Sequence, residues 1–133
     1  MPNLYPSWIE IPAADLDRAT AFYRAVFELD ETPLFDEPPS KIVLLMSSDK
    51  SRQKPGLSLI VSPIHRPSDG GAVINFHVGG YAAFDLALSR VREFGGKVDT
   101  EVVEMDDGVR YVNLLDCEGN RIALSAYEGA DDL

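Results

Sequence analysis

The sequence predicts an α+β domain made of two consecutive halves, each with the order strand, helix, three strands. This order of apolar patterns occurs twice, on either side of residues 62–71 (SPIHRPSDGG), which are rich in proline, serine and glycine and are typical of a connector. A single half would leave one face of its sheet uncovered, so both halves are expected to share one core. We therefore expect one domain over residues 1–133, with a first module at about 5–62 and a second at about 72–128.

The first half begins with a short strand at residues 7–12, in which Trp8 and Glu10 lie on one face and isoleucines on the other. Asp15 is a typical helix N-cap, and apolar side chains then recur at helical spacing as far as Phe27. Three apolar stretches follow and are expected to be strands, at residues 32–35, 41–46 and 57–61.

The second half repeats this order. A strand is expected at residues 73–78, followed by a helix at 81–94 that ends at Gly95 and Gly96, since a paired glycine favours a left-handed stop. Three more strands separated by glycine-containing turns are expected, at residues 97–104, 109–115 and 121–127.

The composition argues against several classes of partner. Twelve Lys and Arg stand against 22 Asp and Glu, and the resulting charge of −10 repels phosphate backbones and anionic lipid surfaces, so neither nucleic acid nor membrane is expected as a partner. The longest apolar run, residues 42–46, is far shorter than a membrane span, and no signal-peptide pattern is present, so a cytoplasmic location is expected. Cys117 is the single cysteine and has no intramolecular disulfide partner.

Several motifs resemble one family. The run Trp8-Ile-Glu-Ile-Pro12, the helix start at Asp15, and the second-half features of a paired glycine and the turn Asp116-Cys-Glu-Gly-Asn120 resemble the vicinal oxygen chelate superfamily. This superfamily includes glyoxalase I, the bleomycin-resistance proteins and the extradiol dioxygenases. The resemblance implies a partly open, eight-stranded curved sheet around a cavity, and a homodimer whose partner completes or covers that cavity. The chain departs from the family pattern at Glu28, where glycine is common, and at Cys117, where proline is usual.

The resemblance also implies four metal-ligand positions, one on each of the first, fourth, fifth and eighth strands. In this chain they fall on Trp8, near Leu59, on Val73 and on Ala123, and none of these side chains coordinates a divalent metal. No metal and no other cofactor are therefore expected. A relocated metal site made from Glu10, His77 and a third residue is the alternative.

Strand alternation predicts which side chains face the cavity, since residues of one parity share a face. The more polar parity gives a predicted ligand-binding set of Trp8, Glu10, Leu59, Asn75, His77 and Ser125. Among these, Glu10 is the candidate general base and His77 the candidate second proton-transfer group. The structural alternative for Glu10 is a carboxylate hydrogen-bonded to backbone or to Asn75. His65, in the connector, is assigned no role.

These features favour a glyoxalase/bleomycin-resistance-like protein that binds a small organic molecule in the sheet cavity without a metal. The alternative is a lyase, isomerase or dioxygenase-type enzyme that uses Glu10 as base or a relocated divalent metal, so whether the chain is an enzyme stays open. A third class is an interaction module without a ligand. The identity of the ligand and the arrangement of the dimer lie outside what the sequence specifies.

Overall fold

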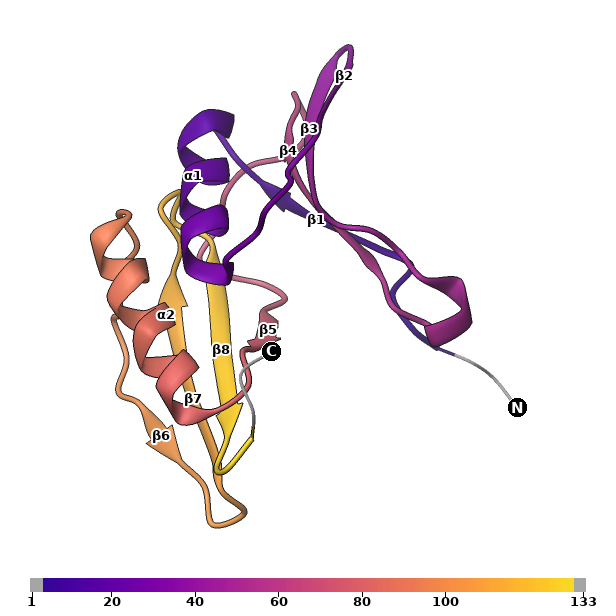
Figure 1. The fold of residues 1–133 in the computed structure, drawn as a ribbon. Helices are drawn as coiled ribbons and strands as arrows, with labels where there is room; N and C mark the ends of the chain where they lie inside the picture. The colour runs from indigo at the N-terminus through magenta and orange to yellow at the C-terminus, as the bar shows by residue number, and fades with distance from the viewer. Residues whose placement is uncertain (1–3, 131–133) are drawn as a thin grey trace.

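The computed structural model describes residues 4–130 (Figure 1). Two α-helices, a short 3-10 helix and eight strands occur within this range. Their bounds are β1 Trp8–Pro12, α1 Leu16–Phe27, β2 Leu34–Glu37, β3 Ser40–Met46, η1 Lys50–Arg52, β4 Gly56–Val61, β5 Ile74–His77, α2 Tyr81–Glu93, β6 Val103–Glu104, β7 Val109–Leu115 and β8 Arg121–Tyr127.

The strands form two four-stranded mixed sheets with the same topology. The order is β1-β4-β3-β2 in the first sheet and β5-β8-β7-β6 in the second. The pairs β1/β4 and β5/β8 are parallel, and the remaining pairs are antiparallel. The predicted α+β fold of two βαβββ modules is thereby confirmed. The sheet is not closed: β1 and β5 are the outer strands of two separate sheets (Figure 1).

The sixth strand is much shorter than expected. It covers only Val103–Glu104, although Lys97 makes an isolated bridge to Leu115. Between these points Thr100 donates its hydroxyl hydrogen to the carbonyl of Asn113 at 2.7 Å. Side-chain contact therefore holds much of the segment beside β7, where the sequence predicted a continuous backbone ladder.

Helix α1 begins where the sequence predicted. Asp15 has extended backbone angles, and its Oδ1 accepts the N–H of Arg18 at 3.1 Å, which satisfies one of the free donors of the first turn. The helix ends at Glu28, which adopts the left-handed conformation at φ 56°. A non-glycine residue thus occupies the position where the family resemblance predicts glycine, and its carboxylate pairs with Arg90 at 2.8 Å.

Both helices contribute to one hydrophobic core. Phe22 and Tyr23 of α1 and Phe84 of α2 are fully buried in it, together with aliphatic side chains from both sheets. The chain packs tightly against both helices just after the end of α2. A Cβ at Gly96 would lie 2.7 Å from Val91 and 2.9 Å from Phe22, too close for any side chain. The paired-glycine stop is confirmed: Gly95 has φ 93°, and Gly96 allows the chain to pass between the two helices.

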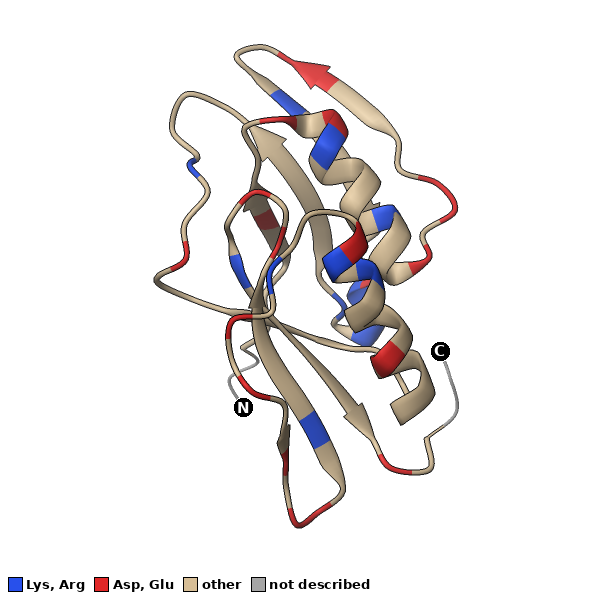
Figure 2. Cartoon of the chain, turned by 90° about the vertical axis from the view of Figure 1, so that its left-hand side faces the viewer, with Lys and Arg blue, Asp and Glu red and all other residues tan. Residues whose placement is uncertain are grey.

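Charged residues are distributed over the surface. Figure 2 shows lysine and arginine on the helices alongside acidic residues, while further acidic residues occupy loops and strand ends. Neither α-helix of the described residues is long and apolar enough to cross a bilayer.

Candidate functional site

Trp8 lies across the first sheet with its indole ring held in place. In the parallel register Trp8 is opposite Gly56, and a Cβ at position 56 would collide with the ring. Its Nε1–H donates to Ser58 Oγ at 3.1 Å. One face of the indole is therefore against β4, and the side chain is still 46% exposed. The conformation leaves an oriented aromatic surface available to a ligand.

Leu59 does not share this face, contrary to the sequence-based expectation. It is opposite Ile11, is fully buried and belongs to the core under the helices. Ser58, opposite Glu10, is the β4 residue on the Trp8 side. Strand β4 follows a loop, and shifting the parity by one residue exchanges the two faces of a strand. The alternation Leu57-Ser58-Leu59 carried the correct signal, since serine is its polar member.

Glu10 has a histidine partner from the connector. Nε2 of His65 lies 3.6 Å from Glu10 Oε1, and both side chains are partly buried, at 25% and 35% exposure respectively. On the other side of the ring, His65 Nδ1 lies 2.5 Å from Ser62 Oγ, which also accepts the N–H of Ile64. The structure thus brings together three side chains that the sequence analysis had not connected. The spacing Ser62-x-x-His65 was the available signal.

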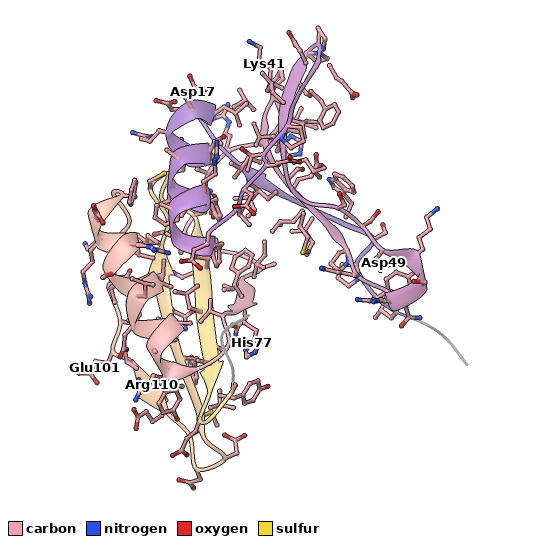
Figure 3. The ribbon with its side chains drawn as sticks, in the orientation of Figure 1. Asp17, Lys41, Asp49, His77, Glu101 and Arg110 are labelled. Carbon is pink, nitrogen blue, oxygen red and sulfur yellow. The ribbon has the colours of Figure 1, made fainter. Side chains whose placement is uncertain are left out.

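The remaining predicted site residues lie on the second sheet. Asn75 and His77 of β5 are opposite Ala123 and Ser125 of β8. His77 packs against the ring of Tyr127, with 5.0 Å between centroids. Among the described residues no hydrogen bond or ion pair joins any of Asn75, His77 or Ser125 to Glu10. His77 is labelled in Figure 3 on its own sheet, away from the first one.

A small cavity adjoins Glu10 at the boundary between the modules. It has a volume of about 190 Å³. The connector covers one side, β1 forms another, and the start of β8 forms the third. Its lining includes the charged residues Glu10, Arg66 and Arg121 and the apolar residues Ile11, Ile74 and Ile122. The cavity therefore combines apolar walls with a few polar groups, as small-molecule sites usually do.

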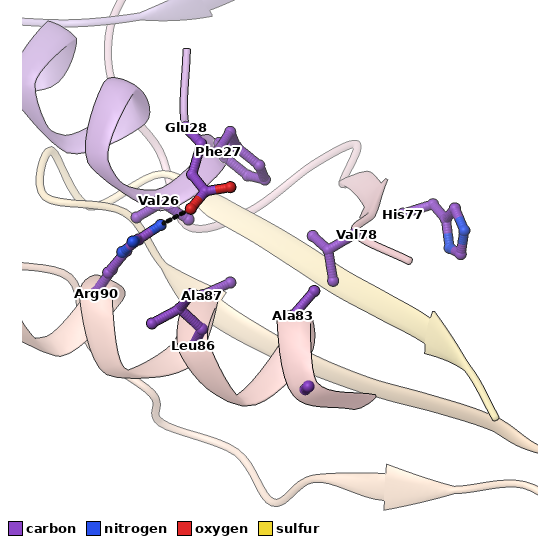
Figure 4. A pocket seen from close by; sticks show the side chains of 10 residues that line it. Val26, Phe27, Glu28, His77, Val78, Ala83, Leu86, Ala87 and Arg90 are labelled. Carbon is purple, nitrogen blue, oxygen red and sulfur yellow. Dashed lines mark hydrogen bonds and ion pairs between the residues drawn. The ribbon is translucent and has the colours of Figure 1, made fainter. Parts of the chain in front are cut away.

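A larger hollow of about 290 Å³ lies between the end of α1 and one face of α2 (Figure 4). Alanines of α2, Phe27 and His77 line it, and the Glu28–Arg90 ion pair lies at one side. Neither Trp8 nor Glu10 lines it.

Cys117 is a poor nucleophile in its present environment. Burial, together with the neighbouring carboxylates of Asp116 and Glu118, raises the pKa of its thiol to about 12. Since the thiolate is the reactive form, this cysteine is protonated at neutral pH.

The four ligand positions that the family resemblance implies, namely Trp8, the neighbourhood of Leu59, Val73 and Ala123, carry side chains that do not fit a divalent cation. Beside Leu59, Ser58 offers one hydroxyl on the Trp8 face, and Ala123 is buried. Among residues 4–130 no group of three or more His, Cys, Asp or Glu side chains is arranged to hold a metal.

The two βαβββ modules, with the same strand order in each sheet, are the fold of the glyoxalase class of proteins. Residues 6–124 match the model of the Glyoxalase/Bleomycin resistance protein/Dioxygenase superfamily, and the chain belongs to this family. No curated protein matches the sequence.

Solved structures of the same fold cover nearly the whole chain at low identity. A glyoxylase/bleomycin resistance protein/dioxygenase domain from Frankia sp. EAN1pec has a TM-score of 0.72 and 13% identity, covering 96% of this chain and 100% of its own. A glyoxalase/bleomycin resistance protein from Albidiferax ferrireducens T118 has a TM-score of 0.67, 19% identity and coverages of 90% and 96%. Lactoylglutathione lyase from Agrobacterium tumefaciens has a TM-score of 0.63, 24% identity and coverages of 94% and 95%. At these identities the likeness establishes the fold.

Proposed function

We propose that this protein binds a small organic molecule, without a metal, on the face of the first sheet that carries Trp8 and Glu10. The observation that carries the proposal is the oriented indole of Trp8, half exposed and hydrogen-bonded to Ser58, beside the partly buried carboxylate of Glu10. An exposed aromatic face costs free energy in water, and a ligand that covers it recovers that cost. Chemically inert side chains at the four family metal positions support a metal-free site.

The proposal includes a homodimer. Several large apolar side chains on the faces opposite the helices are exposed, namely Trp8, Phe35, Val73, Val103 and Tyr127. A second copy that covers these faces would bury this area, and two-fold pairing is the commonest oligomeric arrangement. Within the dimer we assign Asn75, His77 and Ser125 as further ligand contacts. Sedimentation of the purified protein should give twice the chain mass of 14.6 kDa.

The test uses chelator-treated, dialysed protein in a thermal-shift screen against small aromatic metabolites and antibiotics. A ligand that binds only the folded state stabilises it by RT ln(1 + L/Kd), where L is the free ligand concentration, so the melting temperature rises with the logarithm of the ligand concentration above Kd. We expect hits whose shift is lost in Trp8→Ala and retained in Asp99→Asn, a substitution on the second module, where Asp99 pairs with Arg121. The proposal fails if no compound shifts the melting temperature, or if shifts appear only after a divalent metal is restored.

The pairing of Glu10 with His65 favours a second candidate, a metal-independent lyase or isomerase with Glu10 as general base. Each compound that raises the melting temperature would be incubated with the protein in D₂O and followed by proton NMR. An enzyme of this kind exchanges a carbon-bound hydrogen of its substrate for deuterium, and Glu10→Gln abolishes that exchange. A pure binder shows no exchange, and Glu10→Gln only weakens its affinity.

A further inference from the structure

Trp8 and Glu10 lie on the same face of β1, because they are two residues apart in a strand. That spacing separates their Cα atoms by about 6–7 Å. An aromatic face and a carboxylate at this separation are together complementary to an organic cation. The indole face attracts a cation through its quadrupole, and the carboxylate supplies the opposite charge.

Both groups are oriented before a ligand arrives. The contact with Gly56 and the hydrogen bond to Ser58 hold the indole plane against the sheet. His65 Nε2 lies 3.6 Å from Oε1 of Glu10, so an imidazole edge faces that carboxylate from the connector. Preorganised groups lose little conformational entropy on binding, which favours affinity for a small ligand.

The ring of His65 lies between Ser62 and Glu10. Ser62 Oγ accepts the N–H of Ile64 and lies 2.5 Å from Nδ1 of His65, while Nε2 faces Glu10. When the hydroxyl of Ser62 donates to Nδ1, the proton of the neutral ring is on Nε2 and points towards the carboxylate. When the ring takes up a second proton, a full positive charge lies 3.6 Å from the Glu10 carboxylate.

Two other charged side chains, Arg121 and Arg66, line the cavity beside Glu10. Arg121 lines the same cavity, but both of its terminal nitrogens are held by Asp99, at 2.6 and 2.9 Å. Arg66 lines the cavity from the connector and keeps its charge over the whole physiological pH range. His65 is the histidine that lies beside Glu10, and histidine is the kind of side chain that can gain a charge near neutral pH.

We propose that Trp8 and Glu10 form a site for an organic ammonium ion and that protonated His65 competes with this ion for the Glu10 carboxylate. The inference rests on the proposed function and specifies its ligand class. The net charge of −10 is consistent with it, since an acidic protein attracts cations.

The experiment uses the fluorescence of Trp8, the single tryptophan of the chain. The probe is benzyltrimethylammonium, whose charge does not change with pH, and benzyl alcohol is the neutral control. At about pH 8 we expect saturable quenching by the cation with an affinity about tenfold above that for the alcohol, and Glu10→Gln should remove this difference. Lowering the pH to about 5.5 should weaken cation binding about fivefold in the unmodified protein.

His65→Gln should abolish this pH dependence. The matched control is His77→Gln, which changes the other histidine of the chain and should keep the pH dependence, whatever its effect on affinity. Nitrogen-15 NMR of His65 at about pH 8 should show the Nε2–H tautomer. A histidine that only forms a hydrogen bond with Ser62 could adopt either tautomer. Circular dichroism verifies that each variant is folded.

Failure of the inference is distinguishable from failure of the proposed function. Equal affinity for cation and alcohol would overturn the ligand class while leaving a small-molecule site in place. Acid weakening that persists in His65→Gln would overturn the role of His65 alone. If neither probe quenches Trp8 and the thermal-shift screen is also negative, the proposed function fails with the inference.

Discussion

The turn between β7 and β8 and the turn between β3 and β4 occupy equivalent places in the two modules, but only the first of them is built into the core. Asp116 and Asn120, in the β7–β8 turn, are buried. The β3–β4 turn contains the short helix η1, has no buried residue in that helix and projects away from the second sheet (Figures 1 and 3). The two modules have the same topology, but their connection is made through the β7–β8 turn of the second module.

The connection is a set of hydrogen bonds from the second module to the first. Tyr23 of α1 donates its hydroxyl hydrogen to Asp116 at 2.6 Å, and Asn120 donates to the carbonyl of Pro12 at 2.8 Å. Glu118, with a side chain only 2% exposed, accepts the backbone N–H groups of Ala14 and Asp15. These are donors at the start of α1, where a negative charge is also favoured by the helix dipole.

Helix α2 lacks this support. Its N-cap is Gly80, which provides no side-chain hydrogen bond. In this protein the hydrogen bonds of the β7–β8 turn therefore support the start of α1, while the start of α2 has no equivalent side-chain support among the described residues.

Asp116→Ala should lower the free energy of unfolding by about 3 kcal/mol, because it leaves several buried donors without an acceptor. The groups affected are the Tyr23 hydroxyl, the Asn120 amide and the backbone N–H groups of Glu118 and Asn120. Urea unfolding would measure the loss. The matched change Asp49→Ala removes exposed hydrogen bonds to Ser51 within the β3–β4 turn and should cost no more than about 1 kcal/mol. Equal losses at the two sites would contradict the comparison.

Stability should fall at alkaline pH through Tyr23. Burial, and then the charge of Asp116, raises the pKa of the Tyr23 phenol well above its ordinary value. The folded state thus holds this proton more tightly than the unfolded chain, so the contribution is complete below about pH 10 and is lost as the pH rises towards the folded-state pKa. Thermal unfolding between about pH 8 and 11 should show this loss, and Tyr23→Phe should flatten it while costing about 1 kcal/mol at neutral pH.

Glu118→Gln should lower stability by about 1 kcal/mol. The amide keeps one acceptor for the start of α1 but removes the charge that interacts with the helix dipole and with Arg18, whose guanidinium is 3.0 Å away. Chemical denaturation in low and high salt separates the two contributions, since only the loss of charge should diminish at high salt. A stabilising effect of the substitution would argue against Glu118 as a cap.

Cys117 should react with a disulfide reagent at about pH 8 at least about a hundredfold more slowly in the folded protein than in urea. The reason is the pKa of about 12 in the folded state, caused first by burial and then by the neighbouring carboxylates. Absorbance of the released thiolate measures both rates. Modification of Cys117 is expected to change stability less than the changes described in the three predictions above. A fast reaction in the folded state would show that the β7–β8 turn opens readily.

A similar comparison applies to the two outer strands. β1 carries Trp8 and Glu10, each with a hydrogen-bonding or charged partner, whereas β5 carries Asn75 and His77 at related positions, with His77 packed on Tyr127. The proposed ligand platform is thus a property of the first module. The similar elements of the second module instead belong to a sheet whose turn anchors α1.

The sequence by itself determined the order of the elements, the Asp15 cap, the stop at Gly95 and Gly96 and most of the core. These features depend on local spacing and on backbone preferences, which adjacent residues encode. Only the tertiary structure decided that Ser58 and not Leu59 shares the Trp8 face, and that His65 and not His77 is the partner of Glu10. The physical reason is that strand register and the path of a connector depend on pairing between distant residues, where a shift of a single residue exchanges the two faces of a strand.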